Sequence, residues 1–252
     1  MIFYFSATGN CKYVATRLAD SGERVIAIAE AMKASEYIYS IPKNDAIGII
    51  SPTYHCALPS IVNEFLERLK LQYEEKPYVY FVATYGTTSG QTGLYANRYM
   101  EKKGLPFDAY YSVKMPDTWT PVFDLSNKEA VERIIKKAEE PIKEIRKQVK
   151  NNTTGNFMKA KIPRLAVKLF YPHYEKSRMT RNFHVEESCI GCGICEKKCP
   201  VAAIEIKDGK PVWIKEQCVM CLGCLHRCPK FAIQYGNNTK KHGQYRHPHV
   251  KL

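Results

Sequence analysis

The feature that most constrains this chain of 252 residues is a pair of cysteine runs with identical spacing. One reads Cys189-Ile-Gly-Cys192-Gly-Ile-Cys195-Glu-Lys-Lys-Cys199-Pro200, and the other reads Cys218-Val-Met-Cys221-Leu-Gly-Cys224-Leu-His-Arg-Cys228-Pro229. Every cysteine and the proline of the first run recur 29 residues later, and Ala203-Ile204 recurs as Ala232-Ile233. The two runs therefore form an internal repeat of the kind that duplication produces.

The spacing of each run, C-x2-C-x2-C-x3-C-P, indicates iron–sulfur chemistry. Three thiolates spaced three residues apart on a tight loop can surround one small inorganic cube, and the proline turns the chain away after the fourth. This spacing is the bacterial [4Fe–4S] pattern, in which the fourth cysteine of each run binds the other cluster. Structural zinc instead takes two separated pairs of ligands. The sequence predicts two [4Fe–4S] clusters, one held by Cys189, Cys192, Cys195 and Cys228, the other by Cys218, Cys221, Cys224 and Cys199.

Short strand signals surround the two runs. They lie at Asn182–Val185, Ile204–Ile206, Val212–Ile214 and Ile233–Tyr235, with a hairpin turn at Asp208-Gly209. Residues 182–236 thus resemble a bacterial two-[4Fe–4S] ferredoxin over its whole length, with no ligand missing. A unit this small folds poorly without metal. Because the fourth cysteine of each run would bind the cluster of the other run, the two clusters would also join the two halves of the unit.

Cysteine content and charge bear on location and partners. Ten cysteines in a chain whose first residues carry no secretory signal favour the reducing cytoplasm. No apolar run reaches the roughly 18 residues that a membrane helix needs, so we expect no transmembrane segment, while peripheral membrane contact stays open. Residues 1–150 carry a net charge of +2 and residues 151–252 one of +11. Anionic clusters would offset part of this excess, and no nucleic-acid-binding motif is recognisable, so we expect no nucleic acid partner.

Residues 1–150 alternate strand and helix patterns. Strands are expected at Met1–Phe5, Arg24–Ile28, Ala46–Ile50, Tyr78–Ala83 and Phe107–Val113, and helices at Asn10–Ala19, Ser60–Leu71, Gln91–Lys103 and Lys128–Lys150. The alternation of five strands with four helices predicts an α/β fold with a doubly wound, five-stranded parallel sheet. Pro141 should kink or restart the last helix. Because such sheets bind ligands at the carboxyl ends of their strands, the loops after strands one, three and four are the candidate sites.

The first of these loops reads Ser6-Ala7-Thr8-Gly9-Asn10-Cys11 and runs directly into a helix. Hydroxyl groups and free backbone N–H groups at a helix N-terminus suit a phosphate, although an ordinary capped turn is the alternative. The loop lacks the lysine of a Walker motif and the glycines of a dinucleotide site. It resembles the Ser/Thr-x-Thr-Gly-x-Ser/Thr phosphate loop of flavodoxins, which bind FMN. Cys11 stands where that family usually has a hydroxyl residue.

Two further loops extend the resemblance to flavodoxins over about residues 1–150. They read Ser51-Pro52-Thr53-Tyr54-His55-Cys56-Ala57-Leu58-Pro59 and Thr84-Tyr85-Gly86-Thr87-Thr88-Ser89-Gly90. The resemblance implies that they sandwich the isoalloxazine ring. Each of the two tyrosines would stack on the ring or pack in the core, Gly86 would let backbone approach the ring, and the threonines would bond its edge or the ribityl chain. The predicted FMN-binding residues are Ser6, Ala7, Thr8, Gly9, Asn10, Cys11, Ser51, Pro52, Thr53, Tyr54, His55, Thr84, Tyr85, Gly86 and Thr87.

The rest of the chain connects and extends these two units. Polar residues 151–155 mark a boundary, and a short helix bounded by Pro163 and Pro172 follows within a basic bridge, residues 151–181. The bridge is a linker packed between domains or a docking surface for an acidic redox partner or a membrane. Residues 237–252 are polar and basic, and we expect a mobile tail. The expected domains are thus residues 1–150, the bridge, residues 182–236 and the tail.

The whole chain resembles fusions of a flavodoxin-like domain with a two-[4Fe–4S] ferredoxin. Clusters pass one electron at a time, whereas a flavin accepts one or two. We therefore expect an electron path between FMN and the clusters, and a redox protein partner that docks at the cluster surface. The alternative is a flavoenzyme whose FMN reduces a quinone or an unsaturated acid, with His55 as candidate proton donor. A carrier needs little open volume over the flavin ring, whereas an enzyme needs a pocket there.

Overall fold

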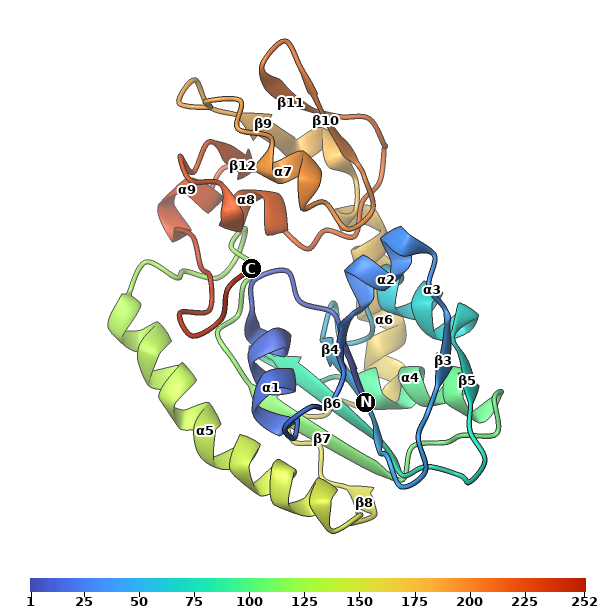
Figure 1. Cartoon of the computed structure of the whole chain (residues 1–252). Coiled ribbons are helices and arrows are strands. Elements are labelled where there is room, and N and C mark those ends of the chain that lie inside the picture. Colours follow the sequence, from blue (N-terminus) through green and yellow to red (C-terminus); the bar gives the residue numbers. More distant parts are fainter.

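The protein, described here by a computed structural model, has a C-terminal unit seated on the carboxyl edge of an α/β unit (Figure 1). Because this unit carries both cysteine runs, at residues 189–199 and 218–228, we call it the cluster unit. The structure describes the backbone of residues 1–252 and every side chain except those of residues 168–170. Among the described residues, no helix combines the length and the apolar character that crossing a bilayer requires.

A parallel sheet organises the α/β unit. Its strands are β1 (Ile2–Tyr4), β2 (Val25–Ala27), β4 (Ile47–Pro52), β6 (Val79–Tyr85), β7 (Ala109–Lys114) and β8 (Gly155–Asn156). They lie in the order β2-β1-β4-β6-β7-β8, and all neighbours are parallel. The predicted doubly wound sheet is confirmed, with the two-residue strand β8 added at one edge. The chain crosses from one side of β1 to the other after β2, and this order places the ends of β1, β4 and β6 side by side.

Helices cover both faces of the sheet. On one face, α1 (Asn10–Leu18) and α5 (Lys128–Lys150) bury apolar residues such as Val14 and Ile142 against β1 and β6. On the other face, α3 (Ser60–Arg68) and α4 (Thr92–Glu101) do the same with Phe65 and Met100. Because both faces are covered, the strands between them are almost entirely apolar.

Several elements differ from the sequence expectation. Three short ones were not predicted: α2 (Ile28–Ala34) and the parallel pair β3 (Ile38–Ser40) and β5 (Lys70–Gln72). Helix α5 continues through Pro141 instead of restarting, because its buried stripe at Ala138, Ile142 and Ile145 stays packed on the sheet. Only one intrahelical hydrogen bond is lost where proline lacks its N–H.

The bridge contains a longer helix than expected. Helix α6 (Arg164–Ser177) starts directly after Pro163 but continues past Pro172. Tyr171 and Tyr174, on either side of Pro172, pack against the α/β unit and the cluster unit, and these contacts outweigh the local cost of the proline.

The cluster unit repeats one small motif. Its elements are η1 (Thr180–Asn182), β9 (Phe183–Val185), α7 (Ile194–Lys197), β10 (Ile204–Lys207), β11 (Lys210–Trp213), α8 (Gly223–Arg227) and β12 (Ile233–Tyr235). Strands β9 and β12 pair antiparallel, as do β10 and β11. Asp208 and Gly209 join the latter pair with φ of 49° and 75°, the conformation that a tight hairpin turn requires. Helices α7 and α8 each follow a loop that carries the first two cysteines of a run, and each helix contains the third, Cys195 or Cys224.

In place of the expected mobile tail, residues after Gly236 fold back onto the α/β unit. They include α9 (Thr239–His242), after which the chain crosses to the start of α1, near the end marked C in Figure 1. Tyr245 and His247 are 5% and 1% exposed, and the His247 ring stacks on Tyr13 with centroids 4.1 Å apart. The tail is polar in composition, but these rings bury enough surface to hold it.

Candidate functional site

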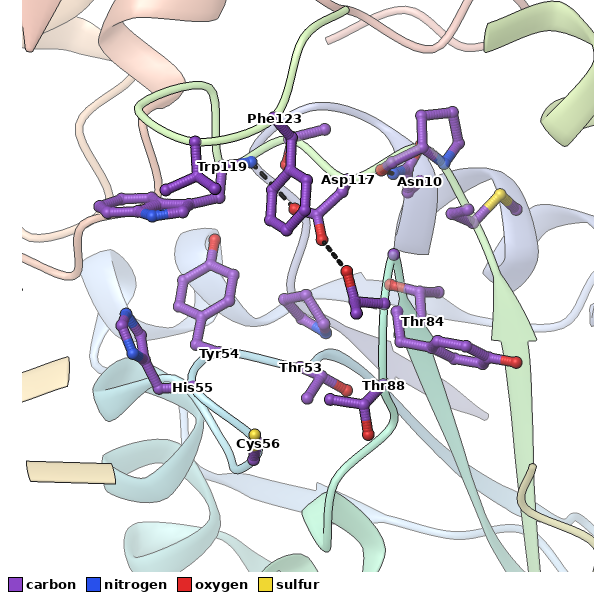
Figure 2. Close-up of a pocket in the computed structure, with 18 of the residues that line it drawn as sticks. Asn10, Thr53, Tyr54, His55, Cys56, Thr84, Thr88, Asp117, Trp119 and Phe123 are labelled. Atoms are coloured by element: carbon purple, nitrogen blue, oxygen red, sulfur yellow. Dashed lines mark hydrogen bonds between the residues drawn. The ribbon is translucent and has the colours of Figure 1, made fainter. Parts of the chain in front are cut away.

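A cavity of about 750 Å³ lies at the carboxyl edge of the sheet, beneath the cluster unit (Figure 2). Nine predicted FMN-binding residues line it: Asn10, Pro52, Thr53, Tyr54, His55, Thr84, Tyr85, Gly86 and Thr87. Its size lies within the usual range for ligand pockets, roughly 300–1,000 Å³. Because predicted FMN-binding residues line it, we refer to it as the flavin cavity.

The loop after β4 reaches this cavity through a tight turn. Tyr54 and Ala57 exchange two backbone hydrogen bonds of 2.9 Å. The two residues between them, His55 and Cys56, have φ of 44° and 70°. Left-handed backbone at two successive non-glycine residues costs energy and is typical of functional loops. The turn places His55 and Tyr54 on the same wall of the cavity (Figure 2).

The loop after β7 closes the opposite wall and was not predicted from the sequence. Asp117 accepts hydrogen bonds from the Thr87 hydroxyl (3.2 Å) and the Trp119 backbone N–H (3.1 Å), and so joins this loop to the one after β6. Burial raises the pKa of the Asp117 carboxyl. A side chain at Gly86 would overlap Asp117, so this close approach requires glycine. The sequence could have indicated this loop only by its position, because it also follows the carboxyl end of a strand in the sheet.

Aromatic side chains surround His55. Its ring centroid lies 6.0 Å from that of Trp119 and 5.7 Å from that of Tyr174. Burial, and then the nearby His173, lower the pKa of His55 and so favour the neutral form of its ring. Its Nε2 lies 3.4 Å from the Ser177 hydroxyl. A neutral imidazole at this wall carries one N–H that a bound ligand can accept from.

The predicted phosphate loop lies at the start of α1. Gly9 has a φ of 105°, and its N–H donates to the Ser6 hydroxyl at 3.1 Å. The backbone N–H groups of Ala7, Thr8, Asn10 and Cys11 have no acceptor among the described residues. Free N–H groups at the N-terminus of a nine-residue helix are what a phosphate requires, so this loop fits the phosphate of FMN.

Six predicted residues lie outside the flavin cavity: Ser6, Ala7, Thr8, Gly9, Cys11 and Ser51. The Cys11 side chain is buried, and its Sγ lies 3.1 Å from the Thr84 hydroxyl. Burial raises the pKa of this thiol to about 12, so it is a packed neutral group. Ser51 is also fully buried, and its hydroxyl donates to the carbonyl of Pro52 at 2.9 Å. These two side chains therefore shape the strand ends without reaching the cavity.

The eight cysteines of the repeat line two separate small cavities. Cys189, Cys192, Cys195 and Cys228 line one, which we call the outer cysteine ring. Cys199, Cys218, Cys221 and Cys224 line the other, the inner cysteine ring. Each ring takes three cysteines from one run and the fourth from the other run. Four thiols around one cavity are the donor set of a [4Fe–4S] cluster, so these residues fit such a group.

The two rings differ in depth. Cys192 of the outer ring is exposed, and Ile190 beside it is 60% exposed. Burial raises the pKa of Cys218 to about 12 and that of Cys221 to about 11 in the inner ring, and it also raises the pKa of Cys195 in the outer ring to about 11. These thiols hold their protons until a metal displaces them. Cys221 and its neighbours Met220 and Leu222 also line the flavin cavity, so the inner ring adjoins it.

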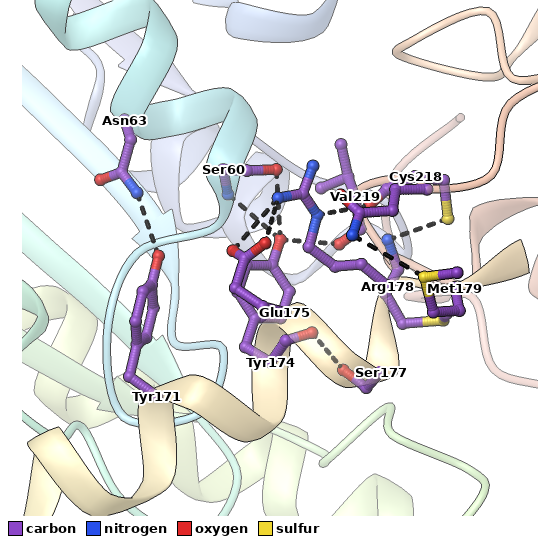
Figure 3. Close-up of polar contacts among 12 residues, drawn as sticks. Ser60, Asn63, Tyr171, Tyr174, Glu175, Ser177, Arg178, Met179, Cys218 and Val219 are labelled. Atoms are coloured by element: carbon purple, nitrogen blue, oxygen red, sulfur yellow. Dashed lines mark hydrogen bonds and ion pairs between the residues drawn. The ribbon is translucent and has the colours of Figure 1, made fainter.

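Helix α6 fixes the inner ring against the α/β unit (Figure 3). The Tyr174 hydroxyl donates to the carbonyl of Val219 at 2.9 Å and accepts from the backbone N–H of Ser60 at 3.1 Å. The Arg178 Nε donates to the carbonyl of Cys218 at 2.8 Å. The buried Tyr174 ring also lines the flavin cavity, so one helix positions the inner cysteine loop and the cavity wall together.

The fold and these cavities define a doubly wound α/β protein with a strand-edge ligand cavity next to two cysteine rings. Residues 1–144 match the family model of the flavodoxin domain, and residues 188–233 match that of the 4Fe-4S dicluster domain. The first match covers more than half of the chain, and the chain belongs to the flavodoxin domain family. Together the two matches support an iron–sulfur flavoprotein in electron transfer.

Comparison with solved structures found distant similarities. Rubredoxin oxygen:oxidoreductase from the anaerobe Desulfovibrio gigas is 18% identical with a TM-score of 0.34, over 57% of this chain and 35% of that one. The chain thus spans about a third of that protein. A flavone reductase is 12% identical with a TM-score of 0.38, over 84% of this chain and 80% of that one. A comparison with curated proteins found no match.

Proposed function

We propose that the protein transfers electrons between a redox protein partner and FMN through two [4Fe–4S] clusters in series. One observation carries this proposal: Cys221 borders both the inner cysteine ring and the flavin cavity. A cluster in the inner ring would therefore lie next to a flavin in the cavity, while the outer ring meets solvent at Cys192. The order is outer cluster, inner cluster, FMN.

The two kinds of cofactor supply complementary chemistry. Clusters exchange single electrons, whereas flavin exchanges one or two, so their combination connects one-electron and two-electron partners. The residues of this chain bind and separate the cofactors. The loops after β4, β6 and β7 enclose the ring site, the loop before α1 offers N–H groups to the phosphate, and the inner cysteine loop forms the shared wall. Thiolate ligands support a reducing compartment such as the cytoplasm.

The proposed order predicts different defects for the two clusters. In Cys192→Ala, loss of the outer cluster should nearly abolish reduction of FMN by a reduced protein donor, because the entry point is missing. In Cys221→Ala, the donor should still reduce the outer cluster, while FMN stays oxidised. Anaerobic stopped-flow absorbance, which separates cluster bleaching from flavin bleaching, measures both. Rapid FMN reduction in Cys192→Ala contradicts the series order, and Tyr73→Phe, at an exposed side chain outside both rings and the flavin cavity, is the control.

The surface around the outer ring indicates an acidic partner. Ile190 and Ile194 are exposed apolar residues beside the exposed Cys192, and they form the centre of a small contact patch. Lys210 and Lys230 are exposed at its edge, next to residues that line the outer ring. An apolar centre with a cationic rim favours a transient redox partner that carries carboxylates around its own electron exit.

Reversing the charge at this rim should slow association. We expect Lys210→Glu with Lys230→Glu to lower the second-order rate of reduction by an acidic ferredoxin or flavodoxin several-fold at low ionic strength. The difference from the wild type should shrink as salt is added, because salt screens exposed charges. Lys136→Glu with Lys137→Glu, on the exposed side of α5, is the matched control. Equal rates for both double variants would exclude this face as the docking surface.

A second candidate function is a flavin-dependent reductase of a small molecule. The observation in its favour is the volume of the flavin cavity, about 750 Å³, together with its aromatic wall of Trp119, Phe123 and Tyr174. In that case His55 is the candidate proton donor, and the substrate is a planar apolar acceptor such as a quinone. Turnover of a quinone by the fully loaded protein, lost in His55→Phe while FMN stays bound, would favour this candidate over a pure carrier.

A further inference from the structure

Residues from the C-terminal half of the chain, which carries the cysteine runs, contact the proposed phosphate loop at five successive positions, from Ser6 to Asn10. At the start of the loop, the Arg227 Nη2 donates to the backbone carbonyl of Ser6 at 3.3 Å. Gly223, at the beginning of α8, packs beside Ala7, since a Cβ on Gly223 would lie 3.7 Å from the Cβ of Ala7. Helix α8 therefore covers the first two residues of the loop.

The C-terminal tail covers the other three residues. The backbone N–H of His247 donates to the carbonyl of Thr8 at 2.8 Å. A Cβ on Gly9 would lie 2.6 Å from the Cβ of His247, so the tail lies directly against this glycine. The Tyr245 hydroxyl donates to Oδ1 of Asn10 at 2.7 Å. The loop from residue 6 to residue 10 is thus enclosed by residues that follow Met220 in the sequence.

Asn10 connects this covering to the flavin cavity. Its Nδ2 donates to the carbonyl of Pro116 at 3.1 Å, and Asn10 and Pro116 both line the cavity. Its backbone N–H is one of the free donors at the start of α1. Loss of the Tyr245 hydroxyl would leave the buried Oδ1 without its donor, and an unsatisfied buried acceptor favours rearrangement of the loop.

The tail is itself anchored to the cysteine-bearing segment. The Gln244 Nε2 donates to the carbonyls of Leu225 (2.6 Å) and Cys228 (2.8 Å). The Tyr245 backbone N–H donates to Nδ1 of His226 at 3.2 Å. All three acceptors belong to α8 or to Cys228 directly after it, a residue of the outer ring. We call residues 244–247 the tail clasp.

Helix α8 depends on the cysteine rings for its own stability. It has five residues, too few for an isolated helix to be stable in water. It runs between Cys221 and Cys228 and includes Cys224, so ligands of both rings hold it in place. A metal cluster that binds these thiols supplies the free energy that orders such a segment.

We propose that the clusters and the tail clasp together hold the phosphate loop in its FMN-binding conformation, so that loss of the clusters weakens FMN binding. This inference rests on the proposed FMN and cluster sites. The clusters order α8, α8 holds the tail clasp and Arg227, and these groups fix residues 6–10. By linkage, bound FMN stabilises the clusters by the same factor. The cofactors then assemble as one unit, and FMN is retained only where clusters can exchange electrons with it.

The test is a set of four FMN titrations followed by flavin fluorescence under anaerobic conditions. They compare the wild type and Gln244→Ala/Tyr245→Phe, each with intact clusters and after removal of iron by a chelator. Removing the clusters from the wild type should raise the Kd for FMN about tenfold, within the usual range of coupling between sites. The double variant with intact clusters should also bind FMN more weakly. Removing the clusters from the double variant should then raise the Kd for FMN by a smaller factor than cluster removal does in the wild type, because both changes act on the same loop.

Controls separate the possible failures. Tyr73→Phe removes a hydroxyl that has no partner among the described residues, and its Kd should equal that of the wild type. If the wild type with intact clusters binds no FMN, the proposed function fails. If it binds FMN with a Kd that neither cluster removal nor the double variant changes, only the clasp is wrong. If circular dichroism shows that the protein unfolds when its iron is removed, the Kd of the double variant with intact clusters is the deciding measurement. A Kd equal to that of the wild type then contradicts the proposed role of the tail clasp.

Discussion

Replacement of Cys199 by alanine should halve the iron content of the protein, from about eight to about four atoms per chain, because one of two four-iron clusters loses a ligand. Cys199 is the fourth cysteine of the first run but lines the inner ring with Cys218, Cys221 and Cys224 of the second run. The cluster that disappears should therefore be the one formed mainly by the second run. Iron and sulfide analysis after anaerobic reconstitution measures the loss.

Pairs of substitutions decide which cluster is lost. Cys199→Ala combined with Cys221→Ala removes two ligands of the same ring, so about four irons should remain, as in either single variant. Cys199→Ala combined with Cys192→Ala removes one ligand from each ring, so almost no iron should remain. If each run bound its own cluster, these two results would be exchanged. Cys11→Ala, outside both rings, controls for the loss of a buried thiol.

The α/β core could be predicted from the sequence because its signals are periodic and local. Strands such as β4 and β6 are continuous apolar runs, and long helices such as α5 carry a regular buried stripe. The missed elements α2, β3, β5 and β8 have only two to seven residues, too few to show a period. Ile28 was assigned to a strand, whereas the structure starts α2 there without any intervening turn residue.

The candidate site could be predicted only where a motif stands in one stretch of sequence. The loops after β1, β4 and β6 were found because the switch-point rule directs attention to them. Asp117 and Trp119 lie on the loop after β7, which leaves the same carboxyl edge but lies beyond the switch point. Asp117 accepts a hydrogen bond from Thr87 of another loop, and the Trp119 N–H donates to Asp117 within its own loop. Tyr174 and Tyr245 are further away in sequence, and only tertiary packing brings them to the site. The assignment of four cysteines to each ring could be predicted from their spacing, because the repeat and the ligand pattern each lie within one short stretch of sequence.

Substitution of Gly90 by alanine should weaken FMN binding about tenfold or more, which corresponds to roughly 1.4 kcal/mol. Gly90 lies at the end of the loop after β6, with a φ of 56°, and packs against the loop after β4. A Cβ at this position would overlap the backbone carbonyl of Cys56, which also accepts a hydrogen bond from the Gln91 N–H at 2.9 Å. The two loops proposed to sandwich the flavin ring would have to separate. Titration of the flavin-free protein with FMN measures the change in Kd.

Gly104→Ala provides the matched control for backbone strain. Gly104 has a φ of 72°, but a Cβ there would meet nothing within 4 Å, and it lies beyond α4, outside the flavin cavity. Left-handed backbone costs an alanine roughly 1–2 kcal/mol relative to glycine, so both variants lose a similar amount of folding stability from strain alone. Only Gly90→Ala also displaces a cavity wall. Equal FMN affinities in the two variants would show that the contact between these loops does not control the flavin site. Weaker binding in Gly90→Ala alone would show that FMN affinity depends on the packing of Cys56 against Gly90.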